Sequence, residues 1–135
     1  MIMAWLQQYP ILLPFISILG AEITKFMVDW IKQRDKKRFV NPGGMPSGHS
    51  AFVSSLVVVV AYREGIESTL FAVAAVIALI VMYDAIHLRN EAGKHATAIN
   101  LHHDAELEES LGHNHWEVIV GSLFGATLSF VLLVV

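Results

Sequence analysis

Four long apolar runs constrain this chain most, because a helix that crosses a bilayer needs about 20 mostly apolar residues. The runs lie at about residues 9–31, 50–62, 69–86 and 118–135. The third run has no charged residue before Asp84. Open sheet edges are excluded from lipid, so helices are favoured over strands even in the β-branched second run. The sequence therefore predicts an all-α, integral-membrane helical bundle of about four transmembrane helices, forming one domain over residues 1–135.

The composition agrees with a membrane location and excludes other classes of protein. The 135 residues are 55% hydrophobic and 16% charged, whereas an ordinary soluble domain is about 25% charged. The chain has no cysteine, which excludes a disulfide scaffold. The net charge of −3 provides no basic footprint for nucleic acid. The expected partner is the lipid bilayer, and no nucleic acid.

Basic residues are divided unequally between the two sides of the predicted bundle. With four crossings, residues 32–48 and 87–116 share one side and residues 63–68 lie on the other. Seven of the nine basic residues fall on the first side, one falls on the second, and Lys25 lies within the first run. The positive-inside rule places the two long polar segments in the cytoplasm. The expected location of the protein is the bacterial inner (cell) membrane. Residues 32–38 also fit a plain anchor for anionic lipid head groups.

A glycine-rich segment, GGMPSGHS at residues 43–50, stands directly before the second apolar run. Glycines let backbone N–H groups surround an anion, and a helix N-terminus adds partial positive charge. Ser47 can cap the helix or donate to a phosphate oxygen. His49 lies in the first turn, where it can give a proton to a leaving group. A plain Gly/Pro turn with a serine cap explains the segment equally well.

A second polar motif, GHNHWE at residues 112–117, precedes the fourth run. His113 and Glu117 are four residues apart and share one face of a helix. A carboxylate on one imidazole nitrogen fixes the tautomer and leaves the other nitrogen nucleophilic. We expect His115 and Trp116 to be interfacial. The motif therefore predicts His113 as a nucleophile that Glu117 orients.

Further charged residues lie close to or within the apolar runs. An aspartate at a helix end near a membrane surface, such as Asp84, is a functional candidate, and Arg89 carries the planar fork that suits phosphate. Lys94 follows on the same side. Glu22 and Lys25 are three residues apart, so a mutually neutralising pair explains them as well.

The last apolar run contains Gly121 and Gly125, a spacing that lets another helix approach closely. Four short helices bury little surface, so these glycines suggest self-association. A homo-oligomer is thus one of the expected partners.

These motifs carry a family resemblance. PSGHS before one apolar helix and GHxxxE before another resemble the type 2 phosphatidic acid phosphatase and vanadium haloperoxidase superfamily. GGMPSGHSA, LIVMYDAxxxR, AGKxA and LGHxxxEVxxG are similar to its divergent bacterial and plastid membrane branch, the acid phosphatase/vanadium-dependent haloperoxidase-related family. The resemblance extends from about Lys25 to the C-terminus.

The resemblance implies a lipid phosphatase that works through a phosphohistidine and needs no metal or cofactor. The implied substrate is a lipid phosphomonoester or diphosphate, of the phosphatidic acid, phosphatidylglycerophosphate or isoprenyl diphosphate type. The implied catalytic residues are the nucleophile His113, its orienting partner Glu117 and the general acid His49. The implied phosphate-binding residues are Lys25, Arg38, Ser47, Gly48 and Arg89, and the supporting residues are Asp84 and Lys94.

The chain departs from the superfamily pattern at two points. Arg89 stands 24 residues before His113 instead of only a few, so an inserted segment must fold back for the two to meet. Arg38 is followed by Phe39 instead of proline. The accompanying lysine is either Lys25 or Lys32, and its place in the buried first run favours Lys25.

Two other functions fit parts of the sequence. Six of the seven histidines lie between residues 87 and 115 among acidic residues, a composition that suits zinc, manganese or iron. Because the adjacent His102 and His103 cannot both face one ion from a regular helix, a solvated acidic loop is the simpler interpretation. A non-enzymatic membrane subunit or transporter component, with intramembrane charges along a path, is the third.

Overall fold

The computed structural model of the protein describes residues 8–31, 44–103 and 105–135. Its helices are α2 (Leu12–Ile31), α3 (Gly48–Glu64), α4 (Thr69–Ile86), α5 (Leu88–His102) and α6 (His115–Val134). The described residues contain no strand, which confirms the all-α prediction.

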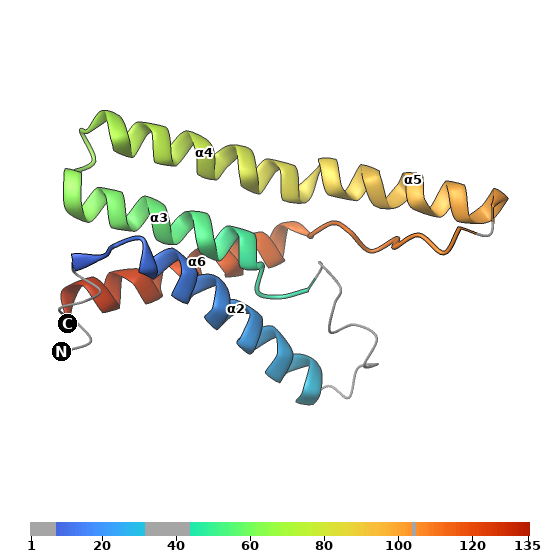
Figure 1. The fold of residues 1–135 in the computed structure, drawn as a ribbon, viewed down its shortest axis with the longest axis horizontal. Coiled ribbons are helices and arrows are strands. Elements are labelled where there is room, and N and C mark those ends of the chain that lie inside the picture. The colour runs from blue at the N-terminus through green and yellow to red at the C-terminus, as the bar shows by residue number, and fades with distance from the viewer. Residues whose placement is uncertain (1–7, 32–43, 104) are drawn as a thin grey trace.

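Helices α3, α4 and α6 run side by side, and α2 packs obliquely on α3 and α6 (Figure 1). Helix α5 continues the direction of α4 beyond the bundle, and residues 105–114 return along it to the start of α6 (Figure 1). The beginnings of α3 and α6 and the end of α4 therefore meet at one end of the bundle. The turn between α3 and α4 lies at the opposite end.

Local capping explains where the helices begin. Ser47 caps α3, Ser68 caps α4, and each side chain accepts a hydrogen bond from a backbone N–H three residues later. Helix α6 begins with a capping box, in which Asn114 and Glu117 each bond the other's backbone N–H. Gly65 ends α3 with a φ of 83°, a conformation that favours glycine.

Residues 88–102 form helix α5, so the expectation of a solvated loop over the whole polar segment was wrong in this half. Several alanines favour a helix here. The return segment, residues 105–114, packs closely on α5, since a Cβ on Gly93 would overlap the carbonyl oxygen of Glu109. Asn100 Nδ2 also donates to Leu107 O at 2.8 Å. The polar segment is thus a helix with an extended stretch of chain laid along it.

Gly121 and Gly125 pack within the chain. A Cβ on Gly121 would overlap the backbone of Ser47, and one on Gly125 would overlap the backbone of Ala51. The predicted close helix approach is therefore real, but the partner is α3 of the same chain. These glycines offer no face to a second copy, so they do not support the homo-oligomer that was expected from them.

Three fully buried hydroxyls join the helices deeper in the bundle. Ser129 of α6 lies within hydrogen-bond distance of Ser17 of α2, at 3.3 Å between oxygens, and of Ser55 of α3. Side-chain hydrogen bonds of this kind hold helices together where lipid offers no hydrophobic driving force. Beyond them, Leu13, Val59 and Leu133 form a small apolar core.

Two helices of the described chain are long and apolar enough to cross a membrane. One is the continuous helical segment that α4 and α5 form together, residues 69–102, and the other is α6. In the most apolar 18-residue stretch of each, only 17% and 28% of the residues are buried, so most of this apolar surface faces outward. Helix α3 is only 17 residues long, and α2 carries Glu22, Lys25 and Asp29. The predicted count of four spanning helices is thus supported for two.

We expect the Gly125→Ala variant to be destabilised by about 1–3 kcal/mol, because the added methyl meets the backbone of Ala51, which no side-chain rotation relieves. Helix propensity alone would stabilise the variant by about 1 kcal/mol. The measurement is thermal unfolding in detergent. Val120→Leu, which adds one carbon at an exposed position of α6, is the control. A melting temperature of Gly125→Ala at or above that of the wild type would contradict the close contact.

Candidate active site

His49 and His113 lie side by side at the end of the bundle where α3 and α6 begin. Their ring centroids are 6.4 Å apart and the rings are inclined by 60°. His49 is the second residue of α3, and His113 directly precedes the cap of α6. The two predicted histidine motifs therefore form one cluster.

His113 is held from several directions and is only 2% exposed. Its backbone N–H donates to Ala85 O at 3.0 Å, and Asn90 Nδ2 donates to its carbonyl oxygen at 3.3 Å. Its Nδ1 lies 3.0 Å from Glu117 Oε2. With a proton on Nδ1 donated to this carboxylate, Nε2 keeps a free lone pair. The predicted pair of His113 and Glu117 is thus present in a geometry that suits a nucleophilic imidazole.

Glu117 joins the two helix starts. Its Oε2 accepts from the backbone N–H of Asn114 at 3.1 Å as well as from His113. Its carbonyl oxygen accepts from the backbone N–H of Ser47 at 3.1 Å. One residue therefore orients His113, caps α6 and fixes the start of α3 against α6.

Arg89 reaches the histidine cluster from the first turn of α5. Its Nη2 lies 3.3 Å from His49 Nε2, and its Nε donates to Asp84 Oδ2 at 3.3 Å. The inserted segment does fold back, because α5 and the return segment bring His113 beside Asn90. Arg89 and Asp84 therefore join the cluster, as the sequence predicted.

The pKa of His49 lies below the ordinary value for a histidine. Burial contributes most, and the positive charge of Arg89 comes next; His113 and Lys25 act in the same direction, whereas Glu22 raises the pKa. Low polarity and cationic neighbours both disfavour the imidazolium. Both effects therefore favour the neutral imidazole of His49.

Lys25 approaches the cluster from α2. Its side chain is 12% exposed and its Nζ lies 2.7 Å from Glu22 Oε2. The neutralising pair considered from the sequence is thus formed. The stem of Lys25 runs beneath Gly44, where a Cβ would lie 3.0 Å from Lys25 Cδ. Gly44 has a φ of 109°, which also favours glycine.

The structure places two further predicted residues, Ser47 and Lys94, and does not describe two others. The Ser47 hydroxyl is fully buried and accepts from Ser50, and the Ser47 N–H is taken by Glu117, so Ser47 shapes the helix start and offers no free amide. Lys94 pairs with Glu91 at 2.6 Å on the exposed surface of α5, away from the cluster. Arg38 and the alternative Lys32 lie outside the described residues.

Two asparagines and the position of Glu22 were not predicted from the sequence. Asn90 ties the base of the α5 segment to His113 and also donates to Ile86 O at 2.6 Å. Asn114 is readable as a capping residue, since a glutamate follows it by three positions. No local pattern indicates Asn90, because its partner is 23 positions away.

The described residues contain no group of three or more histidine, aspartate or glutamate side chains arranged to hold a metal ion. His87 and His115 approach each other with ring centroids 6.4 Å apart, and His87 stacks on Tyr83 at 4.1 Å. His102 and His103 lie at the far end of α5. The histidine-rich segment is therefore spread along α5 instead of gathered at one centre.

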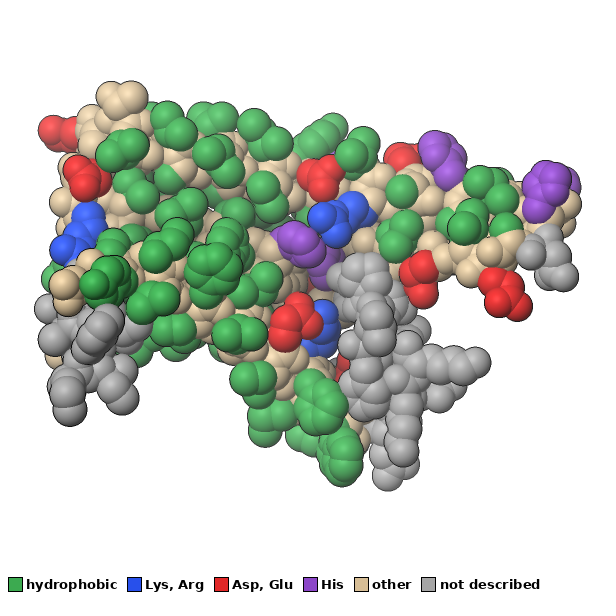
Figure 2. All heavy atoms as spheres, in the orientation of Figure 1, with side chains coloured by type: hydrophobic (Ala, Val, Ile, Leu, Met, Phe, Trp, Pro, Cys, Tyr) green, Lys and Arg blue, Asp and Glu red, His purple; other side chains and the backbone are tan. Residues whose placement is uncertain are grey.

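Figure 2 shows the setting of the cluster. Histidine side chains adjoin basic and acidic side chains where α5 leaves the bundle, and the visible surface of the bundle itself is largely hydrophobic. Charged groups on this face otherwise lie at the opposite end and along α5. The arrangement is a cluster of histidine and charged side chains at the polar end of an apolar helical bundle.

This fold and cluster define a small helical membrane protein with two adjacent histidines at one end of its bundle. Residues 6–128 match the Divergent PAP2 family, and the chain belongs to that family. It is 35% identical to a protein of Bacillus subtilis (strain 168), Uncharacterized membrane protein YuiD, with 96% of this chain and 97% of that protein covered. No solved structure matches the chain. The resemblance found in the sequence is thus confirmed at the level of the family.

We expect Arg89→Gln to raise the pKa of His49, because the substitution removes a neighbouring positive charge that disfavours the imidazolium. The measurement is a histidine-selective NMR titration of the protein in detergent. Lys94→Gln removes a charge of the same sign outside the cluster and is the control. Equal His49 titration curves for wild type and Arg89→Gln would contradict the close approach of Arg89 to His49.

Proposed function

We propose that the protein is a membrane lipid phosphatase that hydrolyses a phosphomonoester or diphosphate at this cluster. The observation that carries the proposal is the pairing of His113, oriented by Glu117, with His49 beside Arg89. Membership of the Divergent PAP2 family supports the same reaction class. The described cluster supplies a nucleophile, a proton donor and cations, which are the groups that phosphoryl transfer needs.

In the proposed reaction, Nε2 of His113 attacks phosphorus in line with the leaving oxygen. The P–N bond forms as the P–O bond to the lipid breaks, and His49 gives its proton to the departing oxygen. Water then attacks phosphorus of the phosphohistidine while His49 takes a proton from the water; the P–N bond breaks, its electron pair returns to Nε2 of His113, and phosphate is released. Arg89 and Lys25, with Arg38 outside the described residues, stabilise the developing negative charge.

A bound anion favours protonation of His49. A phosphate next to the imidazole favours the protonated form, which offsets the effect of burial and of Arg89. A bound phosphate therefore favours the form of His49 that can give a proton to the leaving oxygen. The substrate itself prepares the proton donor.

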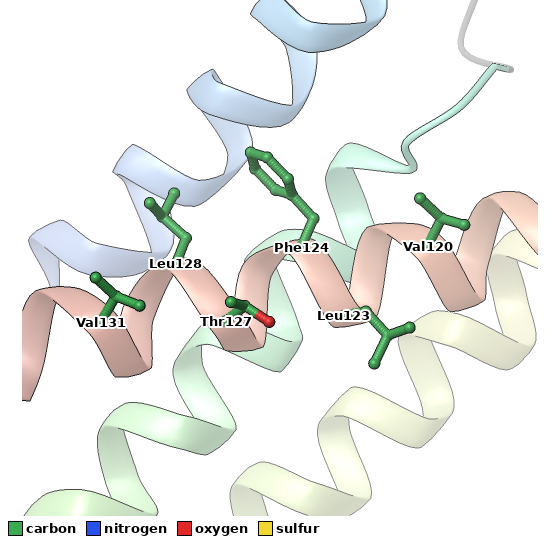
Figure 3. A pocket seen from close by; sticks show the side chains of 6 residues that line it. All are labelled: Val120, Leu123, Phe124, Thr127, Leu128 and Val131. Carbon is green, nitrogen blue, oxygen red and sulfur yellow. The ribbon is translucent and has the colours of Figure 1, made fainter.

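A groove along α6 favours a lipid as the substrate. Figure 3 shows side chains along α6 lining a pocket beside α2, and the only polar one among them is Thr127. The groove begins at Val120, three residues after Glu117. A lipid phosphate needs an apolar groove for its tail next to a cluster that binds its phosphate.

The test is release of phosphate by the protein purified in detergent with excess EDTA. The substrates are phosphatidic acid, phosphatidylglycerophosphate and an isoprenyl diphosphate. We expect hydrolysis of at least one of them, inhibition by vanadate, and a loss of at least about 10³-fold in His113→Ala, which lacks the nucleophile. His95→Ala removes an exposed histidine of α5 and is the matched control.

Two results would redirect the interpretation. Activity that disappears with EDTA and returns with a divalent ion would favour the metal-dependent alternative. Equal behaviour of His113→Ala and wild type, with no lipid hydrolysed, would leave a non-enzymatic membrane protein.

A covalent phosphoprotein that survives base and is lost in acid would identify the phosphohistidine directly.

We further propose that the cluster faces the cytoplasm and that α2 and α3 also cross the membrane. The chain lacks cysteine, so single cysteines report sidedness cleanly. A membrane-impermeant thiol reagent added to intact cells should label Glu67→Cys, in the turn between α3 and α4, and should not label Ala98→Cys on α5. Labelling of both only after lysis, or of Ala98→Cys alone in intact cells, would contradict this orientation.

A further inference from the structure

Glu22 is a carboxylate that the proposed reaction does not use, although it lies within the cluster. Its Oε2 is 2.7 Å from Lys25 Nζ. Its Oε1 is 2.6 Å from the position that a Cβ would occupy on Gly48. Glu22 thus adjoins two of the residues to which phosphate binding is assigned. A side chain at position 48 would require this carboxylate to move.

The other carboxylates of the described cluster each occupy one nitrogen of their partner and leave another nitrogen of that partner available to a phosphate. Asp84 accepts from Nε of Arg89, while Nη2 of the same guanidinium is directed at His49. Glu117 binds His113 through Nδ1 and leaves Nε2 open. Glu22 differs, because its carboxylate lies between Lys25 and the first residue of α3. That is the space in which a phosphate touching both would place an oxygen.

We propose that Glu22 is a specificity-determining residue that makes the site favour a singly charged phosphate over a doubly charged one. The proposal rests on the proposed function. A carboxylate is an acceptor-only anion like a phosphate oxygen, so the two cannot share Lys25 without repulsion. A phosphate must displace Glu22 from Lys25 to bind there, and a dianion is repelled more strongly by this carboxylate than a monoanion.

The surrounding charges set how this preference appears as pH changes. The groups that act on His49 are Arg89 from α5, His113 from the segment before α6, and Glu22 and Lys25 from α2. Glu22 is the acidic member of this set. Its removal should therefore strengthen anion binding most where the anion is doubly charged, and should lower the pKa of His49 further.

The experiment is calorimetric titration of inorganic phosphate into the full-length protein in detergent, at about pH 5 and about pH 8, on either side of the second ionisation of phosphate. We expect Glu22→Gln to bind phosphate roughly tenfold more tightly than wild type at the higher pH and nearly equally at the lower pH. His49 and His113 also gain protons as the pH falls, so the quantity compared is the ratio of variant to wild type at each pH.

Glu67→Gln makes the same charge change at the opposite end of the bundle and should leave both affinities unchanged. Glu22→Asp keeps the charge and should retain the preference for the monoanion, which keeps the proposal testable if Glu22→Gln does not fold. A purely structural role, in which Glu22 holds Lys25 in place, predicts weaker binding by Glu22→Gln at both pH values. That result, unchanged binding at the higher pH, or no phosphate binding by either protein would overturn the proposal.

Lipid hydrolysis, measured in parallel, separates this proposal from the proposed function. Hydrolysis that depends on His113 but no gain in phosphate affinity in Glu22→Gln would overturn the role of Glu22 alone. The expected gain without hydrolysis of any lipid would retain the anion preference and overturn the phosphatase. In an active enzyme, Glu22→Gln should lower KM for a doubly charged substrate more than it changes kcat.

Discussion

The close contact between α3 and α6 is the constraint on which the rest of the structure depends. It needs the absence of side chains at Gly121 and Gly125, because the backbone of α3 occupies the space where their Cβ atoms would lie. At the polar end of the contact, the Ser47 N–H donates to the Glu117 carbonyl. This places the two helix starts side by side, and with them the two histidines. The geometry of the cluster is thus a consequence of helix packing in the apolar part of the chain.

Each described cation of the cluster is matched by a carboxylate, and this limits how strongly the free protein attracts anions. Lys25 pairs with Glu22 and Arg89 with Asp84. An uncompensated group of cations at the edge of an apolar bundle would be costly to bury. The pairs reduce that cost, and they also mean that a phosphate must compete for its ligands. In the proposed phosphatase, phosphate affinity depends on which carboxylate is displaced, and the position of Glu22 between Lys25 and Gly48 makes it the proposed one.

The sequence predicted the helical class, the family and most of the cluster, because these depend on local patterns. Apolar run lengths indicate helices, and the spacing of His113 and Glu117 predicts their contact directly. The partner of Gly121 and Gly125 was not predictable, since close approach to another helix does not specify which helix. Helix α5 was not predicted, because its polar composition suits a loop equally well. Glu22 was interpreted only as the partner of Lys25, because its contact with Gly48 depends on how α2 crosses α3.

The long separation of Arg89 from His113 illustrates why the motifs can diverge while the cluster persists. Helix α5 and the return segment form a hairpin whose two ends lie together at the bundle. Two hydrogen bonds close its base, from the His113 N–H to Ala85 O and from Asn90 Nδ2 to His113 O. The entropic cost of a longer loop grows only slowly with its length, and contacts along this hairpin, such as that between Asn100 and Leu107, offset part of it. The inserted residues therefore change the spacing in the sequence without moving Arg89 away from the histidines, so that spacing alone is a poor measure of whether this arginine serves the site.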